Sequence, residues 1–409
     1  MGHRSTAMAA RYVLRLVCLL AATGSAPFAL FDLAKIVQLT ADQLSGPAWP
    51  TDFLNLYSGA YLMVHAPNDL YNPHAQLAVQ EAALGFAHPL VPFLLPAYSA
   101  LAAAWLGLLP YGTAYLAWLV VGVACILVSA FLLAGRHVLV AAAGLLLFLP
   151  VVEGLGQAQT SALLLLSLAA LAYGLTRHAE PRWLWLAIVG CVIKPQFAPP
   201  LLLALAGDRR YRMLWRAGLV VAALLTASLL LAGHGLISSY RDLSTTKLNE
   251  ALFASADYLP GPTLLHAAQR FLGPNSLVDG LALSIDGLLL GAVVWAWRHG
   301  LASDAQRLLQ LALLPLVAVL AAPYALIHEL SCWPVSFSFL LRYTQGRPAE
   351  RALVLLLAAA IWVAADLGVM EPNGTRGADF AALLGLAAIG YIMVSLRRDA
   401  SVPTCSEAG

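Results

Sequence analysis

Residues 113–134 read TAYLAWLVVGVACILVSAFLLA and contain no charged side chain. An apolar run of this length is long enough to cross the hydrocarbon core of a bilayer as an α-helix. Comparable runs occur on both sides of it, at about residues 90–108, 138–152, 160–176, 183–205, 217–233, 278–297, 306–322, 330–341, 352–370 and 378–396. We therefore expect an all-α polytopic membrane protein with about 11–13 membrane-spanning helices, including a first span that ends near Val37.

The composition points to the same class. Of the 409 residues 61% are hydrophobic and 11% are charged, with a mean hydropathy of +0.78, whereas a soluble domain carries roughly 25% charged residues. A net charge of +2 gives no sign of a nucleic-acid partner, and we predict none. The five cysteines show neither metal-ligand spacing nor a disulfide framework. Because no repeat or soluble domain is apparent, we interpret residues 1–409 as one integral-membrane domain.

The distribution of basic residues predicts which loops face the cytoplasm, because cytoplasmic loops collect Lys and Arg. Residues 34–88 contain one lysine and no arginine, so we place this segment outside. Arginine clusters at residues 209–216, 342–351 and 397–398 are predicted to be cytoplasmic. We therefore expect a multi-pass protein of the cytoplasmic (inner) membrane with both termini in the cytoplasm, including a short tail at 399–409.

Two parts of this topology have alternatives. The N-terminal run follows Arg4, Arg11 and Arg15 and could be a cleaved signal peptide, but its apolar character persists to about Val37, which favours an uncleaved span. Between residues 136 and 206 a simple alternation of spans places Arg177 outside, against the basic-residue bias. We therefore expect short or re-entrant segments there.

The outer segment 47–96 is the longest polar and aromatic stretch in the first half of the chain, and it opens with Trp49-Pro50-Thr51-Asp52-Phe53. Within it, 53–64 and 75–84 have apolar residues at helical spacing but are too short to span, so we expect interfacial amphipathic helices. An acidic residue at a membrane interface is a candidate general base, which makes Asp52 of interest. The simpler alternative is a helix N-cap.

Polar residues inside apolar runs are costly in a bilayer and therefore suggest functional positions. Such residues occur in Gly156-Gln157-Ala158-Gln159, in Ile193-Lys194-Pro195-Gln196 and in Pro323-Tyr324-Ala325-Leu326-Ile327-His328-Glu329. A lysine at a proline-broken helix can bind an anionic phosphate. The alternatives are a snorkelling Lys194, a mutual His328–Glu329 pair, and glutamines that join helices.

The order of these motifs resembles that of glycosyltransferase family 87. The resemblance covers roughly residues 45–345 and rests on the loop aspartate followed by tyrosines, on His88-Pro89-Leu90-Val91-Pro92-Phe93, on Gly156-Gln157, on Ile193-Lys194-Pro195-Gln196 and on Pro323-Tyr324. It implies a GT-C-like membrane bundle and a polyprenyl-phosphate-mannose-dependent α-mannosyltransferase. The implied reaction is an inverting transfer, outside the cytoplasmic membrane, to a hydroxyl of a lipid or glycan acceptor.

The resemblance and the residues together give a set of candidate site residues. Asp52 is the expected general base. We expect the donor phosphate to be bound by Lys194, His328 and Arg241. We expect substrates to be positioned by Tyr57, His88, Gln157, Gln196 and Glu329. No acidic cluster clearly predicts a metal site, although a divalent ion on Asp52 with Glu81 or Glu329 stays open.

Two other classes of function stay open from the sequence. One is a multi-span transporter or flippase, which should show inverted repeats and charged residues near mid-membrane in both halves. Neither feature is evident in the sequence. The other is a non-catalytic, lipid-binding relative of the enzymes.

Overall fold

A computed structural model describes residues 26–31, 33–38, 40–41, 51–176, 183–253, 261–273, 275–298, 303–370 and 375–400. All regular secondary structure within these ranges is helical. The predicted all-α class is therefore confirmed. Trp49, Pro50, the N-terminal arginines and the tail after Ala400 lie outside the described residues.

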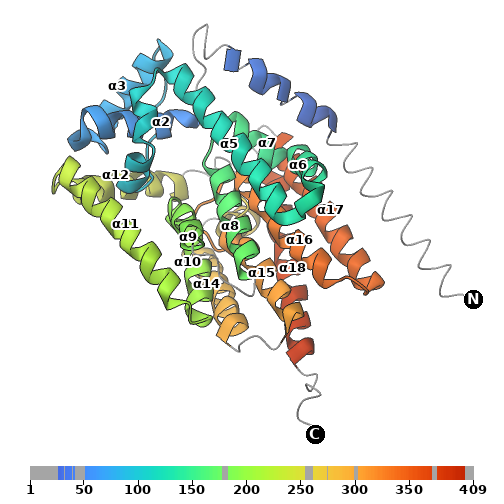
Figure 1. The fold of residues 1–409 in the computed structure, drawn as a ribbon. Helices are drawn as coiled ribbons and strands as arrows, with labels where there is room; N and C mark the ends of the chain where they lie inside the picture. The colour runs from blue at the N-terminus through green and yellow to red at the C-terminus, as the bar shows by residue number, and fades with distance from the viewer. Residues whose placement is uncertain are drawn as a thin grey trace, which may run out of the picture.

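Five helical segments in the described part of the chain are long and apolar enough to cross a membrane. They are Tyr111–Leu147, which comprises α5 (Tyr111–Ala134), η3 (Gly135–His137) and α6 (Val138–Leu147), together with α11 (Tyr211–Ala232), α14 (Ser276–Arg298), α17 (Pro348–Met370) and the Arg376–Asp399 part of α18 (Thr375–Ala400). Figure 1 shows α11 on one flank of the molecule and α17 on the other, with α8, α15 and α16 between them. The chain is a multi-pass membrane protein.

The other predicted spans do not form long helices. The run predicted at 90–108 is not one helix, because it is extended up to Pro96 and then forms α4 (Ala97–Ala102) and η2 (Ala104–Leu108). The remaining predicted spans form shorter helices. They are α7 (Leu149–Gly156), α8 (Ser161–Leu175), α9 (Trp185–Val192), α10 (Ala198–Gly207), α15 (Asp304–Leu320) and α16 (Trp333–Tyr343). The expectation of short segments between 136 and 206 is confirmed, because α7 and α9 have 8 residues each and α6 and α10 have 10 each. Non-helical backbone at such breaks must be buried in protein or line a cavity if it lies within a membrane.

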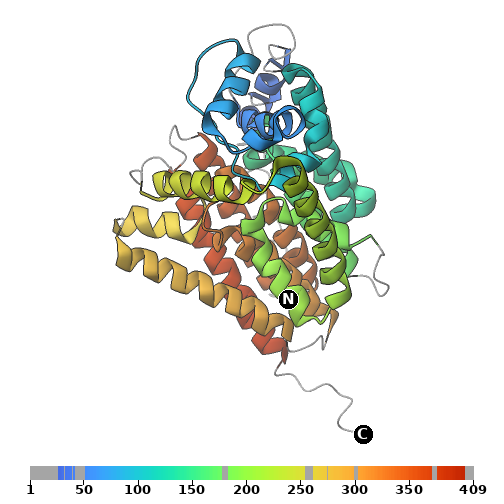
Figure 2. The same ribbon diagram turned by 90° about the vertical axis from the view of Figure 1, so that its left-hand side faces the viewer.

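Residues 51–108 form a helical cap at one end of the molecule. The two short helices predicted there form as α2 (Phe53–His65) and α3 (Pro73–Leu84), joined by η1 (Pro67–Asp69) and followed by α4 (Ala97–Ala102) and η2 (Ala104–Leu108). Figure 2 shows these blue elements stacked on the bundle, with α12 (Leu236–Phe253) lying across the direction of the long helices beneath them. Phe53 anchors the cap, because its ring lies 5.7 Å from the rings of both Tyr111 and Tyr115 at the start of α5.

Two buried glutamines of α3 position the extended segment that follows it. Gln80 donates from Nε2 to the carbonyl oxygen of Val91 (2.6 Å), and its Oε1 accepts the Val91 N–H (3.1 Å). Gln76 accepts the Phe93 N–H in the same way (2.9 Å). These side chains replace the backbone partners that a sheet would provide, so residues 91–93 are fixed without a neighbouring strand.

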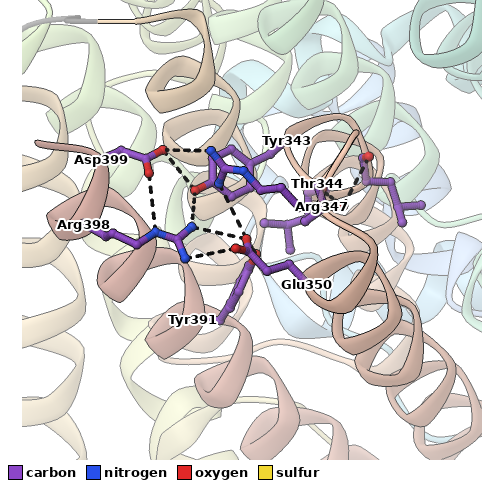
Figure 3. A network of polar contacts seen from close by, with 9 residues as sticks. Tyr343, Thr344, Arg347, Glu350, Tyr391, Arg398 and Asp399 are labelled. Atoms are coloured by element: carbon purple, nitrogen blue, oxygen red, sulfur yellow. Dashed lines mark hydrogen bonds and ion pairs between the residues drawn. The ribbon is translucent and has the colours of Figure 1, made fainter. Parts of the chain in front are cut away.

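At the opposite end a polar cluster joins α16, α17 and α18, as Figure 3 shows. Arg398 donates to Glu350 Oε1 (3.0 Å) and to the Tyr343 hydroxyl (3.0 Å). Tyr343 in turn donates to Asp399 (3.0 Å). These contacts fix the ends of three helices at the end of the molecule that the sequence predicts to be cytoplasmic.

The same end also holds α10 and the start of α15, where Arg307 pairs with Asp208 at 3.2 Å. Because α15 and α16 are packed helices joined by residues 321–332, the start of α15 lies beside the end of α16. The arginine clusters at 209–216, 342–351 and 397–398 therefore gather at one end, away from the cap.

Candidate active site

A cavity of about 260 Å³ lies where the cap meets the bundle. Six separate parts of the chain line it: the start of α2, the extended segment 91–95, the α7–α8 junction, the break after α9, α12, and the segment 324–329. The lining residues are Asp52, Asn55, Leu56, Val91, Pro92, Leu94, Leu95, Ala158, Gln159, Thr160, Lys194, Pro195, Gln196, Tyr240, Tyr324, Ala325, Leu326 and Glu329. The lining includes three charged side chains, those of Asp52, Lys194 and Glu329.

Asp52 occupies the N-cap position of α2, as the simpler alternative predicted, but its carboxylate makes no capping hydrogen bond to the described first turn of that helix. Its Oδ2 instead accepts a hydrogen bond from Gln159 Nε2 at 2.7 Å. The Asp52 backbone N–H donates to Gln157 Oε1 at 3.2 Å, and Gln157 Nε2 donates to Glu153 at 3.1 Å. The carboxylate is therefore directed into the cavity with one oxygen held by an amide.

The α7–α8 junction brings Gln159 to this position. Ala158 has φ +48°, a left-handed conformation that is uncommon for a residue with a Cβ and that reverses the chain between the two helices. A hydrogen bond from the Gln159 N–H to the Gly154 carbonyl oxygen (2.8 Å) closes the turn. A Cβ at Gly154 would lie 2.5 Å from Ser161 Oγ and 3.4 Å from His328 Cβ, so glycine permits this close packing.

Lys194 lies at the break between α9 and η4 (Pro195–Phe197). Pro195 ends the helix because it has no N–H to donate. Carbonyl oxygens near the break find partners in α4: Tyr98 donates its hydroxyl to Val192 (2.6 Å) and Ser99 to Ile193 (3.3 Å). The ammonium of Lys194 is buried, forms an ion pair with Glu329 Oε1, and donates to Gln159 Oε1 at 3.4 Å.

Glu329 lies in η6 (Ile327–Cys332), in the connection between α15 and α16 and outside the five candidate spans. Burial alone would raise the pKa of its carboxyl, but the Lys194 ammonium and His328 together hold that pKa below its usual value. His328 Nε2 approaches Glu329 Oε1 to 3.4 Å. Burial and the charges of Asp52 and Glu329 raise the pKa of Tyr324, which keeps its phenol neutral.

Gln159 is a site residue that the predicted set did not include, and so are Asn55 and Tyr324. Gln159 joins Asp52 to Lys194, since one end of its amide holds the carboxylate and the other accepts from the ammonium. The sequence could have indicated Gln159, because it lies in the same polar motif, Gly156-Gln157-Ala158-Gln159, from which Gln157 was predicted. Gln157 itself contacts the Asp52 backbone, and Gln196 lines the cavity as expected.

Five predicted site residues do not line the cavity. Two of them contact lining residues instead: Gln157 contacts the Asp52 backbone, and His328, predicted as a phosphate ligand, contacts Glu329. The other three lie elsewhere. Tyr57 is five residues beyond Asp52 on α2, so it points to another face of that helix and donates to the Leu109 carbonyl oxygen at 3.1 Å. His88 is half-buried, and its ring bonds locally to the Pro89 carbonyl oxygen. Arg241 is exposed, because α12 turns Leu236, Tyr240 and Leu243 toward the cap and Arg241 away from it.

The arrangement places a carboxylate and a buried ammonium in one cavity, so a single bound molecule could meet both. Among the described residues no group of three or more His, Cys, Asp or Glu side chains could hold a metal ion. Glu81 lies on α3 and is not among the lining residues, whereas Asp52 and Glu329 both are. A second cavity of about 320 Å³, between α16 and α17, is lined almost entirely by apolar side chains and includes neither Asp52 nor Lys194.

Comparison with known proteins found no match among curated proteins and none among solved structures. A family model, glycosyltransferase family 87, matches residues 93–323. This range is more than half of the chain and lies within the span of the resemblance noted from the sequence. It contains Gln159, Lys194 and Tyr240 of the cavity, with Asp52 and Glu329 on either side of it. The chain therefore belongs to glycosyltransferase family 87 and is a membrane glycosyltransferase.

Proposed function

We propose that this protein transfers a sugar, mannose, from a polyprenyl-phosphate donor to a hydroxyl group of a lipid or glycan acceptor. The reaction inverts the configuration of the anomeric carbon and takes place at the extracytoplasmic face of the cytoplasmic membrane. The observation that carries the proposal is that Asp52 and Lys194 line one cavity and are joined through Gln159. The choice of mannose and of a polyprenyl phosphate rests on the sequence resemblance.

Asp52 is the general base. Its other oxygen, Oδ1, accepts the proton of the acceptor hydroxyl while the hydroxyl oxygen attacks the anomeric carbon. Gln159 holds Oδ2, so the carboxylate keeps its orientation. One carboxylate is sufficient, because a phosphate leaves without the protonation that the leaving group of a glycosidase requires.

Lys194 stabilises the leaving group. As the bond between the anomeric carbon and the phosphate oxygen breaks, negative charge develops on the phosphate, and a preorganised ammonium in a buried cavity lowers the energy of that transition state. Lys194 has two features suited to this role: it is buried, and it lies beside a helix break that Pro195 enforces. Gln196 and Tyr324 line the cavity next to it and can donate to sugar or phosphate oxygens.

The position of the cavity fits a lipid-linked donor. It lies under the cap and beside apolar residues of the extended segment, so a polar headgroup can enter while the prenyl chain stays among the helices. The cap carries the outer loop of the predicted topology, and the arginine clusters gather at the other end. Family membership favours this function over a transporter or a flippase. A non-catalytic relative has no need of a correctly oriented base.

The test is transfer of radiolabelled mannose from polyprenyl-phosphate mannose to a membrane lipid extract by the purified protein. Asp52→Asn should lower the rate by about 100-fold or more, because a positioned base contributes roughly that factor. Asp69→Asn is the matched control, since Asp69 is an exposed aspartate of the same cap and does not line the cavity. Transfer by Asp52→Asn at the wild-type rate would remove Asp52 as the base.

A further inference from the structure

The cavity contains more negative than positive charge. Lys194 is the one cationic side chain among the described residues that line it, whereas Asp52 and Glu329 are both carboxylates. A lipid phosphate that enters would add a further negative charge. In a buried site such charges interact more strongly than in water, so the arrangement opposes phosphate binding unless a carboxylate gives way.

The ammonium of Lys194 is already paired with a carboxylate of the protein. It forms an ion pair with Glu329 Oε1, and the two side chains are 10% and 2% exposed. A phosphate could therefore reach the ammonium fully only if Glu329 moved away or shared it. The position that Glu329 Oε1 takes on Lys194 is the one that a phosphate oxygen would take.

The Glu329 carboxylate is also incompletely satisfied. Within the described part of the chain its Oε2 is buried without a hydrogen-bond partner. Buried ion pairs that serve the fold are normally completed by hydrogen bonds to their remaining atoms, because an unpaired buried polar atom is costly. Two contacts, both to Oε1, therefore hold the Glu329 carboxylate: the ion pair with Lys194 and the 3.4 Å approach of His328 Nε2.

We propose that Glu329 is a counter-anion for the empty site, which neutralises Lys194 until the phosphate of the lipid donor displaces it. After transfer the lipid phosphate leaves, and Glu329 pairs again with Lys194, which assists release of the product. This inference rests on the proposed function, and it gives Glu329 a role opposite in sign to that of Lys194. Lys194 strengthens phosphate binding, whereas Glu329 weakens it and thereby keeps the site from being blocked by product.

The direction in which phosphate affinity changes when Glu329 is replaced distinguishes a counter-anion from a purely structural residue. Glu329→Gln keeps the size of the side chain and removes its charge, so the ammonium is no longer neutralised and a phosphate should bind about tenfold more tightly, a change of roughly 1.4 kcal/mol. A residue that merely held Lys194 in place would give weaker binding when replaced. In the transfer reaction the same variant should have a lower kcat and should be inhibited more strongly by added lipid phosphate.

The experiment is a calorimetric titration of the purified full-length protein with farnesyl phosphate. A parallel titration with farnesol provides the uncharged probe. Glu329→Gln should bind farnesyl phosphate more tightly than the wild type does, Lys194→Gln should bind it more weakly, and farnesol binding should not change. Glu81→Gln, outside the cavity, is the matched control. If Glu329→Gln does not fold, Glu329→Ala serves as a second neutral variant, since it leaves room for the phosphate.

The outcomes separate this inference from the proposed function. Binding of farnesyl phosphate by the wild type, with equal or weaker binding by a folded neutral variant of Glu329, overturns the counter-anion role and leaves the donor class intact. Failure of every variant to prefer farnesyl phosphate over farnesol overturns both.

Discussion

Gln159 Nε2 lies 2.7 Å from Asp52 Oδ2, although 107 residues separate the two positions along the chain. The contact joins the cap to the α7–α8 junction of the bundle. The same glutamine accepts from Lys194 at 3.4 Å, so it connects the proposed base with the proposed phosphate ligand. Several consequences of this geometry can be measured.

Replacing Gln159 should impair transfer without removing it. Gln159→Ala frees the Asp52 carboxylate to adopt other rotamers, and we expect kcat/KM to fall by about 10–100-fold, less than for Asp52→Asn. The measurement is steady-state transfer of labelled mannose. Gln345→Ala, an exposed glutamine at the other end of the molecule, should behave as the wild type. A Gln159→Ala enzyme of full activity would mean that Asp52 does not depend on this contact.

Arg241 and Lys194 were both predicted as phosphate ligands, and the structure separates them. Arg241→Gln should change KM for the donor by less than about twofold, because its side chain is exposed and does not line the cavity. Lys194→Gln should lower kcat/KM by about 100-fold or more, since it removes the cavity's ammonium. Equal losses for the two variants would show that Arg241 reaches the donor.

The wall of the cavity depends on Gln80. Gln80→Ala leaves the Val91 N–H and carbonyl groups without their partner, and each unpaired buried group costs about 1–3 kcal/mol. We expect a lower unfolding temperature in detergent and faster proteolytic cleavage between residues 86 and 96. Glu81→Ala, on the next residue of α3, is the control. Unchanged stability of Gln80→Ala would mean that the extended segment is held by other contacts.

The sidedness of the two ends is directly testable. Single cysteines at Ser238 and Gln345, both exposed, can be introduced after the native cysteines are replaced. A membrane-impermeant maleimide should label position 238 in intact cells and position 345 only after permeabilisation. The reverse pattern would place the cavity on the cytoplasmic side and contradict the basic-residue argument.

The sequence predicted the elements better than their contacts. Apolar runs and helical periodicity located α2, α3 and the long spans, because these depend on local pattern and on the demands of the bilayer. Lys194 and Glu329 were predicted as site residues because a polar side chain in an apolar run is costly in a bilayer and therefore suggests a function. Their ion pair was not predicted, since it joins segments 135 residues apart.

The predicted site residues that lie outside the cavity were misplaced for the same reason: their positions depend on contacts between distant segments. Tyr57 and Arg241 belong to helices that line the cavity, but their direction depends on which face of the helix is buried. His88 is in a segment whose path is set by the side chains of Gln76 and Gln80 rather than by its own sequence. Neither the helix face nor these pairings can be derived from one short motif.

The central claim is that Asp52 and Lys194 act in one site on one step. Its most direct measurement is a double-mutant cycle on kcat/KM for mannose transfer with Asp52→Asn, Lys194→Gln and the double variant. We predict that each single variant loses about 100-fold or more, and that the double variant loses clearly less than the product of the two losses. Wild-type transfer by either folded single variant, or fully multiplicative losses, would contradict the claim.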